Sequence, residues 1–108
     1  MVKPVAGEIV VIAFPRTDSE KRRPAFVIAD LPGADLILCQ ITSRRHYDGF
    51  AVTLDKSDFE RGQVDQGCYI RPQRLFTLEH HIILHSLGKV TEAKLEEVLK
   101  RAREFFID

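Results

Sequence analysis

Tryptophan and tyrosine are scarce in this sequence, and the chain carries no net charge. Tryptophan is absent and there are two tyrosines, so a large aromatic binding platform is not expected. The 16 basic side chains balance the 16 acidic ones, and the formal net charge is zero. This balance excludes a protein that binds nucleic acid over its whole surface through charge. Any such site must come from local clusters of lysine and arginine.

Cysteines and long apolar runs are also few. The two cysteines, Cys39 and Cys68, have no partner at the spacing of metal ligands, so neither a metal nor a cofactor is predicted. No secretory signal precedes them, and we expect reduced thiols in a cytoplasmic protein, with a disulfide as the less favoured alternative. The longest apolar run is far too short to cross a bilayer, so no membrane association is predicted.

The remaining composition is that of a globular protein. Hydrophobic residues make up 44% of the chain and charged residues 30%, which excludes a disordered polyelectrolyte. The length suits one domain with a real core, and we see no repeat or linker. We therefore predict a single domain over residues 1–108.

Short β-branched runs between turn signals predict a mainly β protein. A polar, highly charged loop is expected over residues 16–23, and further loops over 44–49 and 55–67. Pro72 is expected to break one strand into two, and residues 82–84 are expected to form a helical turn. The expected strands and extended segments are residues 8–14, 24–29, 35–42, 50–54, 68–71, 74–78 and 85–90.

The last segment has the pattern of an amphipathic helix. Apolar residues recur at helical spacing from Leu95 to Phe106. Thr91 is a suitable N-cap, and Glu92 favours the helix N-terminus. The apolar stripe is expected to be core or dimer packing. Several short strands followed by one helix predict a small β-barrel with the helix packed on it.

Two of the expected strands carry arginine and hydroxyl groups at one end. Arg22 and Arg23 directly precede Pro24, and Thr42 and Ser43 end the run of residues 35–42. If these strands are neighbours, Arg23 and Thr42 can meet at one mouth of the fold. A guanidinium beside a hydroxyl suits a phosphate, because it is always charged and forks onto phosphate oxygens.

An ordered set of short motifs resembles the MazF/PemK toxins of bacterial toxin–antitoxin systems. The resemblance covers nearly the whole chain from Gly7 to the terminal helix. Its motifs are Gly7-Glu8-Ile9-Val10, Phe14-Pro15, Thr17-Asp18, Lys21-Arg22-Arg23-Pro24-Ala25, Asp35-Leu36-Ile37-Leu38, Ile41-Thr42-Ser43, Arg74-Leu75-Phe76-Thr77-Leu78 and Leu87-Gly88-Lys89-Val90.

The resemblance implies an SH3-like barrel with a C-terminal helix, usually a homodimer. It also implies a metal-independent endoribonuclease, an mRNA interferase, that cuts single-stranded RNA to 2′,3′-cyclic phosphate and 5′-hydroxyl ends. A cognate antitoxin with a disordered tail is expected to cover the RNA site. The catalytic pair of the family maps onto Arg23 and Thr42, with Arg23 stabilising charge on the phosphate. Cys68 stands where many relatives carry serine, which affects the neighbouring pocket.

Each functional assignment has a plainer alternative. Arg23 can be a surface arginine paired with Asp18 or Glu20, and Thr42 an ordinary strand residue. The expected basic rim can be solvated charge, and Phe14, a candidate for base stacking like Tyr69, can be core. Gln73 is a candidate for reading a base edge. The expected RNA-contacting residues are Phe14, Arg16, Thr17, Lys21, Ser43, Arg44, Arg45, Arg71 and Gln73.

Histidines offer a second route to ribonuclease chemistry. His46 follows Thr42 closely and can act as an acid or base near neutral pH, although a solvated loop histidine is the more favoured interpretation. His80, His81 and His85 have no partners at ligand spacing, and a histidine-pair mechanism requires two of them to converge with Thr42. The alternative function is a non-catalytic nucleic-acid or partner-binding module, or a gyrase-targeting toxin on the same fold.

Overall fold

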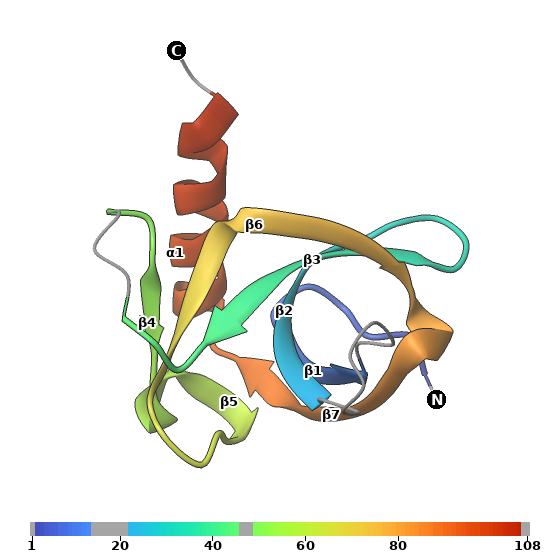
Figure 1. Ribbon diagram of the computed structural model, residues 1–108, viewed down its shortest axis with the longest axis horizontal. Helices are drawn as coiled ribbons and strands as arrows, with labels where there is room; N and C mark the ends of the chain where they lie inside the picture. Colours follow the sequence, from blue (N-terminus) through green and yellow to red (C-terminus); the bar gives the residue numbers. More distant parts are fainter. Residues whose placement is uncertain (1, 14–21, 46–48, 107–108) are drawn as a thin grey trace.

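The computed structural model describes residues 2–13, 22–45 and 49–106. The described residues form seven strands, one α-helix and three short 3₁₀ turns (Figure 1). In chain order these are β1 (Glu8–Ala13), β2 (Arg22–Asp30), β3 (Asp35–Thr42), β4 (Val52–Leu54), η1 (Lys56–Asp58), β5 (Phe59–Gly62), β6 (Cys68–Glu79), η2 (His80–Ile82), β7 (Ile83–Val90), α1 (Glu92–Arg103) and η3 (Glu104–Phe106).

All seven strands belong to one antiparallel sheet. Its order is β4-β6-β3-β2-β1-β7-β5, so β4 and β5 are the two edges. The sheet curls into a half-barrel, with the long strand β6 arching over β3 and α1 standing beside β6 and β4 (Figure 1). The predicted fold class, a small β-barrel with a C-terminal helix, is confirmed, although the barrel is open between its edges.

The central strands β1 and β2 are buried on both faces. Ile9 and its cross-strand partner Phe26 belong to a core cluster that includes Val98 of α1. Val10 and Val27 belong to a second cluster on the other face. Because neighbouring residues of a strand point to opposite faces, burial of both faces requires a continuous apolar run. This explains why β1 lacks the alternation of a half-buried strand.

The predicted break at Pro72 is wrong, because β6 runs continuously from Cys68 to Glu79. The register between β3 and β6 shifts at this point. Cys39 pairs with Leu75, whereas the next residue of β3, Gln40, pairs with Arg71. The extra residues on β6 form a bulge that contains Pro72, and an unpaired bulge residue does not need the N–H that proline lacks.

Two further segments differ from the prediction. Residues 55–67, expected to be a loop, contain η1 and the edge strand β5. The helical turn expected at residues 82–84 lies at His80–Ile82 instead, and Ile83 and Leu84 already belong to β7. Both segments are short, so neither carries enough sequence periodicity to be identified from the sequence alone.

The predicted helix is confirmed, with its cap. The Thr91 hydroxyl oxygen accepts a hydrogen bond from the Lys94 N–H (3.2 Å), which satisfies a backbone donor that has no partner within the helix. Val98 and Ala102 are buried against the sheet. None of the helices in the described ranges is long and apolar enough to cross a membrane.

Candidate functional site

The ends of β2 and β3 that carry the arginines and the threonine lie side by side. The two strands pair antiparallel, with Phe26 opposite Cys39 and Ala25 opposite Gln40. Continued by two residues, this register places Arg23 opposite Thr42. Both residues line one pocket of about 610 Å³. The expectation that neighbouring strands bring Arg23 and Thr42 to one mouth of the fold is therefore met.

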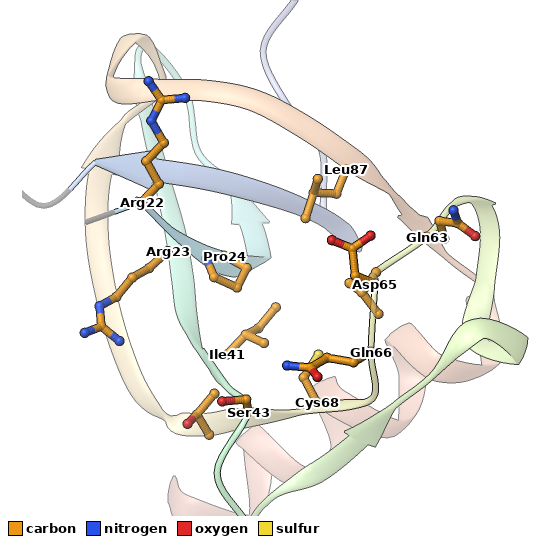
Figure 2. Close-up of a pocket in the computed structure, with 12 residues that line it drawn as sticks. Arg22, Arg23, Pro24, Ile41, Ser43, Gln63, Asp65, Gln66, Cys68 and Leu87 are labelled. Carbon is orange, nitrogen blue, oxygen red and sulfur yellow. The ribbon is translucent and has the colours of Figure 1, made fainter. Parts of the chain in front are cut away.

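The pocket has walls of different chemistry (Figure 2). Arg22 and Arg23 lie at one side, and their side chains extend away from its centre. The loop that connects β5 to β6 supplies the opposite side, together with Leu87 of β7. The described lining residues are Arg22, Arg23, Pro24, Ile41, Thr42, Ser43, Gln63, Val64, Asp65, Gln66, Cys68 and Leu87.

The Thr42 side chain is oriented by the turn that follows β3. Its Oγ1 accepts a hydrogen bond from the backbone N–H of Arg44 (3.1 Å), the local pattern that a threonine at the start of a turn often forms. A hydroxyl group that already accepts one bond keeps its own hydrogen for donation. Thr42 can therefore donate a hydrogen bond to a phosphate oxygen at the edge of the pocket.

Arg23 is exposed at the start of β2, where it pairs with Ile12 of β1. Among the described residues, no carboxylate forms an ion pair with its guanidinium. The two carboxylates considered as alternative partners, Asp18 and Glu20, lie outside the described residues. An exposed guanidinium beside a pocket keeps its donors available for an incoming anion.

The residues of the wall opposite Arg23 were not among the site residues predicted from the sequence, which placed only a loop over residues 55–67 there. It consists of residues 63–66, and the Gln63 N–H donates a hydrogen bond to the Leu87 backbone oxygen (3.3 Å). This contact depends on the pairing of β5 with β7, in which Gly62 lies opposite Gly88. The glycines at positions 62 and 67 frame the segment in the sequence, but nothing local indicates that it faces Arg23.

Both cysteines are free. Burial raises the pKa of the Cys39 thiol strongly and that of Cys68 to a lesser extent. Cys39 lies in the core, whereas Cys68 lines the pocket. At neutral pH Cys68 therefore presents a neutral thiol at the position where the family resemblance implies a serine in many relatives.

A comparison with protein families shows to which family the chain belongs. The model for the PemK-like, MazF-like toxin of type II toxin–antitoxin systems matches residues 6–106. The chain belongs to this family. The resemblance noted in the sequence, that of an endoribonuclease toxin of the MazF/PemK family, is thereby confirmed. A search of curated proteins found no match.

Solved structures of MazF proteins share the fold. The MazE–MazF complex from Deinococcus radiodurans in its second crystal form superposes with a TM-score of 0.75 at 22% identity, covering 98% of this chain and 97% of that one. An endoribonuclease from a Mycobacterial species gives 0.75 at 18% identity, covering 98% and 93%. An endoribonuclease from a Mycobacterial species in complex with its cognate antitoxin gives 0.71 at 19%, covering 94% and 95%.

The other residues expected at the RNA site of this MazF/PemK family member divide into three groups. Ser43 lines the pocket beside Thr42. Arg44 and Arg45 follow it and are exposed, but neither lines the pocket. Arg71 and Gln73 lie on β6 and are not among the lining residues either. The residues expected at Phe14, Arg16, Thr17 and Lys21 lie outside the described residues.

Arg71 has a structural contact in the sheet. Its Nη1 donates a hydrogen bond to the side-chain oxygen of its cross-strand partner Gln40 (3.1 Å). Such a cross-strand side-chain pair adds modestly to the pairing of β3 with β6. The contact of Arg71 with RNA remains a prediction from the sequence.

The described histidines do not gather at the pocket. His80 and His81 lie in η2 and His85 in β7, and none of the three is among its lining residues. Within the described ranges there is also no group of histidine, cysteine and carboxylate side chains arranged to hold a metal ion. His46, the remaining histidine candidate, lies outside the described residues. A mechanism based on two of the described histidines converging with Thr42 is therefore not supported in this family member.

Proposed function

We propose that this protein is the toxin of a toxin–antitoxin pair and a metal-independent endoribonuclease that cleaves single-stranded RNA at the pocket beside Arg23 and Thr42. One observation carries the proposal: the arginine and the threonine of two adjacent strands line the same pocket. Membership of the toxin family and the endoribonucleases among its structural neighbours support it further.

The proposed chemistry is an internal transfer of the phosphate ester. The ribose 2′-oxygen attacks the phosphorus, the bond to the 5′-oxygen breaks, and the products are a 2′,3′-cyclic phosphate and a 5′-hydroxyl. One proton leaves the 2′-hydroxyl and one is gained by the 5′-oxygen, so protons balance. Arg23 supplies a cation that stabilises the added negative charge of the pentacoordinate phosphate.

Thr42 has a complementary role in the proposed site. Because its Oγ1 already accepts the Arg44 N–H, its O–H points a single donor at the phosphate and fixes the orientation of the ester. Ser43 and Arg22, which line the same pocket, extend this contact to neighbouring oxygens. Arg44, Arg45 and Arg71 are proposed to contact the RNA beyond the pocket through its backbone charge.

Two assembly features follow from the same proposal. A cognate antitoxin is proposed to bind over the pocket and exclude RNA, supported by the structures of neighbours in complex with MazE and with a cognate antitoxin. The protein is also proposed to act as a cytoplasmic homodimer. Light scattering after size exclusion should report twice the mass of the 12.4 kDa chain, and a monomer at micromolar concentration would contradict the dimer.

The central test is cleavage of single-stranded RNA by purified protein in the presence of EDTA. We expect cleavage with cyclic phosphate and 5′-hydroxyl ends, and its loss in Arg23→Ala. Lys56→Ala is the matched control, because it removes an exposed cation that does not line the pocket. Cleavage that persists in pure Arg23→Ala protein would overturn the site assignment.

A second measurement separates the alternative functions. Total RNA and the DNA-damage response are followed after induction of the protein in bacteria. We expect RNA loss that Arg23→Ala abolishes. DNA damage with intact RNA would overturn the ribonuclease proposal in favour of a gyrase-targeting toxin, and no effect on either nucleic acid would favour a binding module.

A further inference from the structure

The pocket beside the proposed cleavage site has two parts that the cleavage chemistry does not use. One is an apolar surface formed by Ile41, Val64 and Leu87, all of which pack with or belong to the core. The other is the polar wall of Gln63, Asp65 and Gln66 on the opposite side from Arg23. A phosphate alone requires neither, because it has no apolar face and carries only acceptors.

Both parts suit a flat aromatic ring with hydrogen-bonding groups at its edge. The apolar surface can contact the face of such a ring, and amide and carboxylate groups can pair with its edge. The pocket volume of about 610 Å³ falls in the range of sites for small ligands. In single-stranded RNA each ribose beside the cleaved phosphate carries a nucleobase, whose edge is not occupied by a pairing strand.

Asp65 is the one acidic residue among the three that form this polar wall. Its side chain lies on the pocket side of the β5–β6 connection in Figure 2. Among the described residues, no ion pair or hydrogen bond engages its carboxylate. An ionised carboxylate only accepts hydrogen bonds, whereas the flanking glutamines can either donate or accept. Asp65 is therefore the one residue of the polar wall that, when ionised, can only accept hydrogen bonds from a ligand.

We infer that the pocket is a subsite for one nucleobase next to the cleaved phosphate, in which Asp65 selects bases with an exocyclic amine, guanine above all, against uracil. This inference rests on the proposed ribonuclease function and names its base preference. Guanine presents two adjacent donors, N1–H and the N2 amine, to the two carboxylate oxygens. Uracil presents one N–H between two carbonyl oxygens, which the carboxylate repels.

The experiment is sequencing of cleavage ends from a pool of random single-stranded RNA. The wild-type protein is compared with Asp65→Asn, which keeps the shape of the side chain but replaces one acceptor by a donor. We expect guanine to be enriched and uracil depleted at one position beside the cut. In Asp65→Asn the ratio of guanine to uracil at that position should fall about tenfold, the size of one good bidentate contact.

Glu60→Gln is the matched control. It makes the same change of charge on the edge strand β5, at an exposed position that does not line the pocket. Its base profile should equal that of the wild type. An equal shift in Glu60→Gln would assign the preference to overall charge and overturn the role of Asp65. Circular dichroism of each variant verifies that the fold is retained, and Asp65→Ala serves as a second variant if Asp65→Asn is unstable.

A binding measurement keeps this inference separate from the proposed function. Fluorescence anisotropy is measured with short 2′-deoxy oligomers of uridine that contain or lack one guanosine, which cannot be cleaved through a 2′-hydroxyl. We expect wild-type protein to bind the guanosine-containing oligomer more tightly and Asp65→Asn to lose this difference. Cleavage with an unchanged base profile in Asp65→Asn overturns the inference alone. Absence of any cleavage that depends on Arg23 overturns the proposed function. In that case the difference in anisotropy between the two oligomers alone tests whether the pocket binds guanine through Asp65.

Discussion

Gly62 and Gly88 face each other across β5 and β7 at a distance that leaves no room for a side chain. A Cβ on Gly62 would lie 2.0 Å from the Leu87 backbone oxygen and 2.6 Å from the Gly88 Cα. A Cβ on Gly88 would lie 2.2 Å from the Arg61 oxygen. The next residue, Gln63, donates its N–H to the Leu87 backbone oxygen (3.3 Å), so the close approach of the two glycines fixes where the pocket wall opposite Arg23 begins.

The first prediction concerns this glycine pair. Gly88→Ala should lower the free energy of unfolding by about 2–4 kcal/mol, because the two strands must separate to admit a methyl group. Urea denaturation measures the change. Gly33→Ala is the control, because Gly33 also has a positive φ of 81° but a Cβ added there would meet nothing within 4 Å. Gly33→Ala should lower the free energy of unfolding by only about 1 kcal/mol, the cost of the backbone strain. Equal costs for the two variants would contradict the close approach.

The second prediction concerns the Thr42 hydroxyl. Thr42→Val keeps the β-branched shape but removes the donor, and should reduce the rate of RNA cleavage about a hundredfold. Thr42→Ser retains the hydroxyl and should stay within about tenfold of the wild type. Cleavage of a fluorogenic RNA is followed at saturating substrate. Thr53→Val, an exposed change on β4, should leave the rate unchanged. A fully active Thr42→Val protein would exclude a catalytic role for the hydroxyl.

The third prediction concerns Lys94, a nearly buried cation that attaches α1 to the sheet. Its Nζ donates to the Thr53 backbone oxygen (2.9 Å) and forms ion pairs with Glu97 (2.9 Å) and Asp58 (3.6 Å). Lys94→Ala should lower the free energy of unfolding by about 3 kcal/mol, because it leaves the Asp58 carboxylate without this partner near the core. Thermal or urea unfolding measures it.

Two further variants test why Lys94→Ala is expected to lose stability. Lys94→Met keeps most of the buried methylene stem and should lose less stability than Lys94→Ala. Lys100→Ala, an exposed lysine on the same helix, should change the free energy of unfolding by about 0.5 kcal/mol or less. A loss of similar size at Lys100 would indicate general helix destabilisation instead of the buried contact.

The fourth prediction is a loss of stability at alkaline pH. Burial raises the pKa of Cys39 above its ordinary value of 9.0, so the folded protein keeps a proton that the unfolded chain releases. The contribution of this buried thiol to the free energy of unfolding is fully present below that value. It falls as pH rises above it, by at most about 1.4 kcal/mol per pH unit for one thiol. Urea denaturation at about pH 8 and about pH 10 measures the decline.

Cys39→Ala isolates the contribution of this thiol. The variant should be less stable at neutral pH, by about 1 kcal/mol, because a small cavity remains. Its alkaline decline should be shallower than that of the wild type, since other titrating groups are common to both proteins. Parallel declines would show that the Cys39 thiol does not carry the effect. Cys68, whose pKa is raised in the same direction, contributes to the decline that remains.

Local patterns predicted the elements that are long or strongly marked. The cap at Thr91 and the apolar spacing of residues 95–106 predicted α1, and β-branched runs predicted β1 and β3. The prediction failed at Pro72, because a bulge in β6 accommodates a residue that ordinarily interrupts a strand. It also missed β5, whose residues become a strand only by pairing with β7.

The sequence by itself determined the ingredients of the site: an arginine at the start of one strand, a threonine at the end of the next, and the ordered motifs that identify the family. Only the tertiary structure decided what faces them. The wall of Gln63, Asp65 and Gln66 comes from a connection about forty residues away from Arg23, a separation that reflects the non-local pairing typical of β-barrels. It reaches the pocket because Gly62 and Gly88 let β5 and β7 approach closely. Pairing between distant strands depends on complementary packing, which no local pattern encodes.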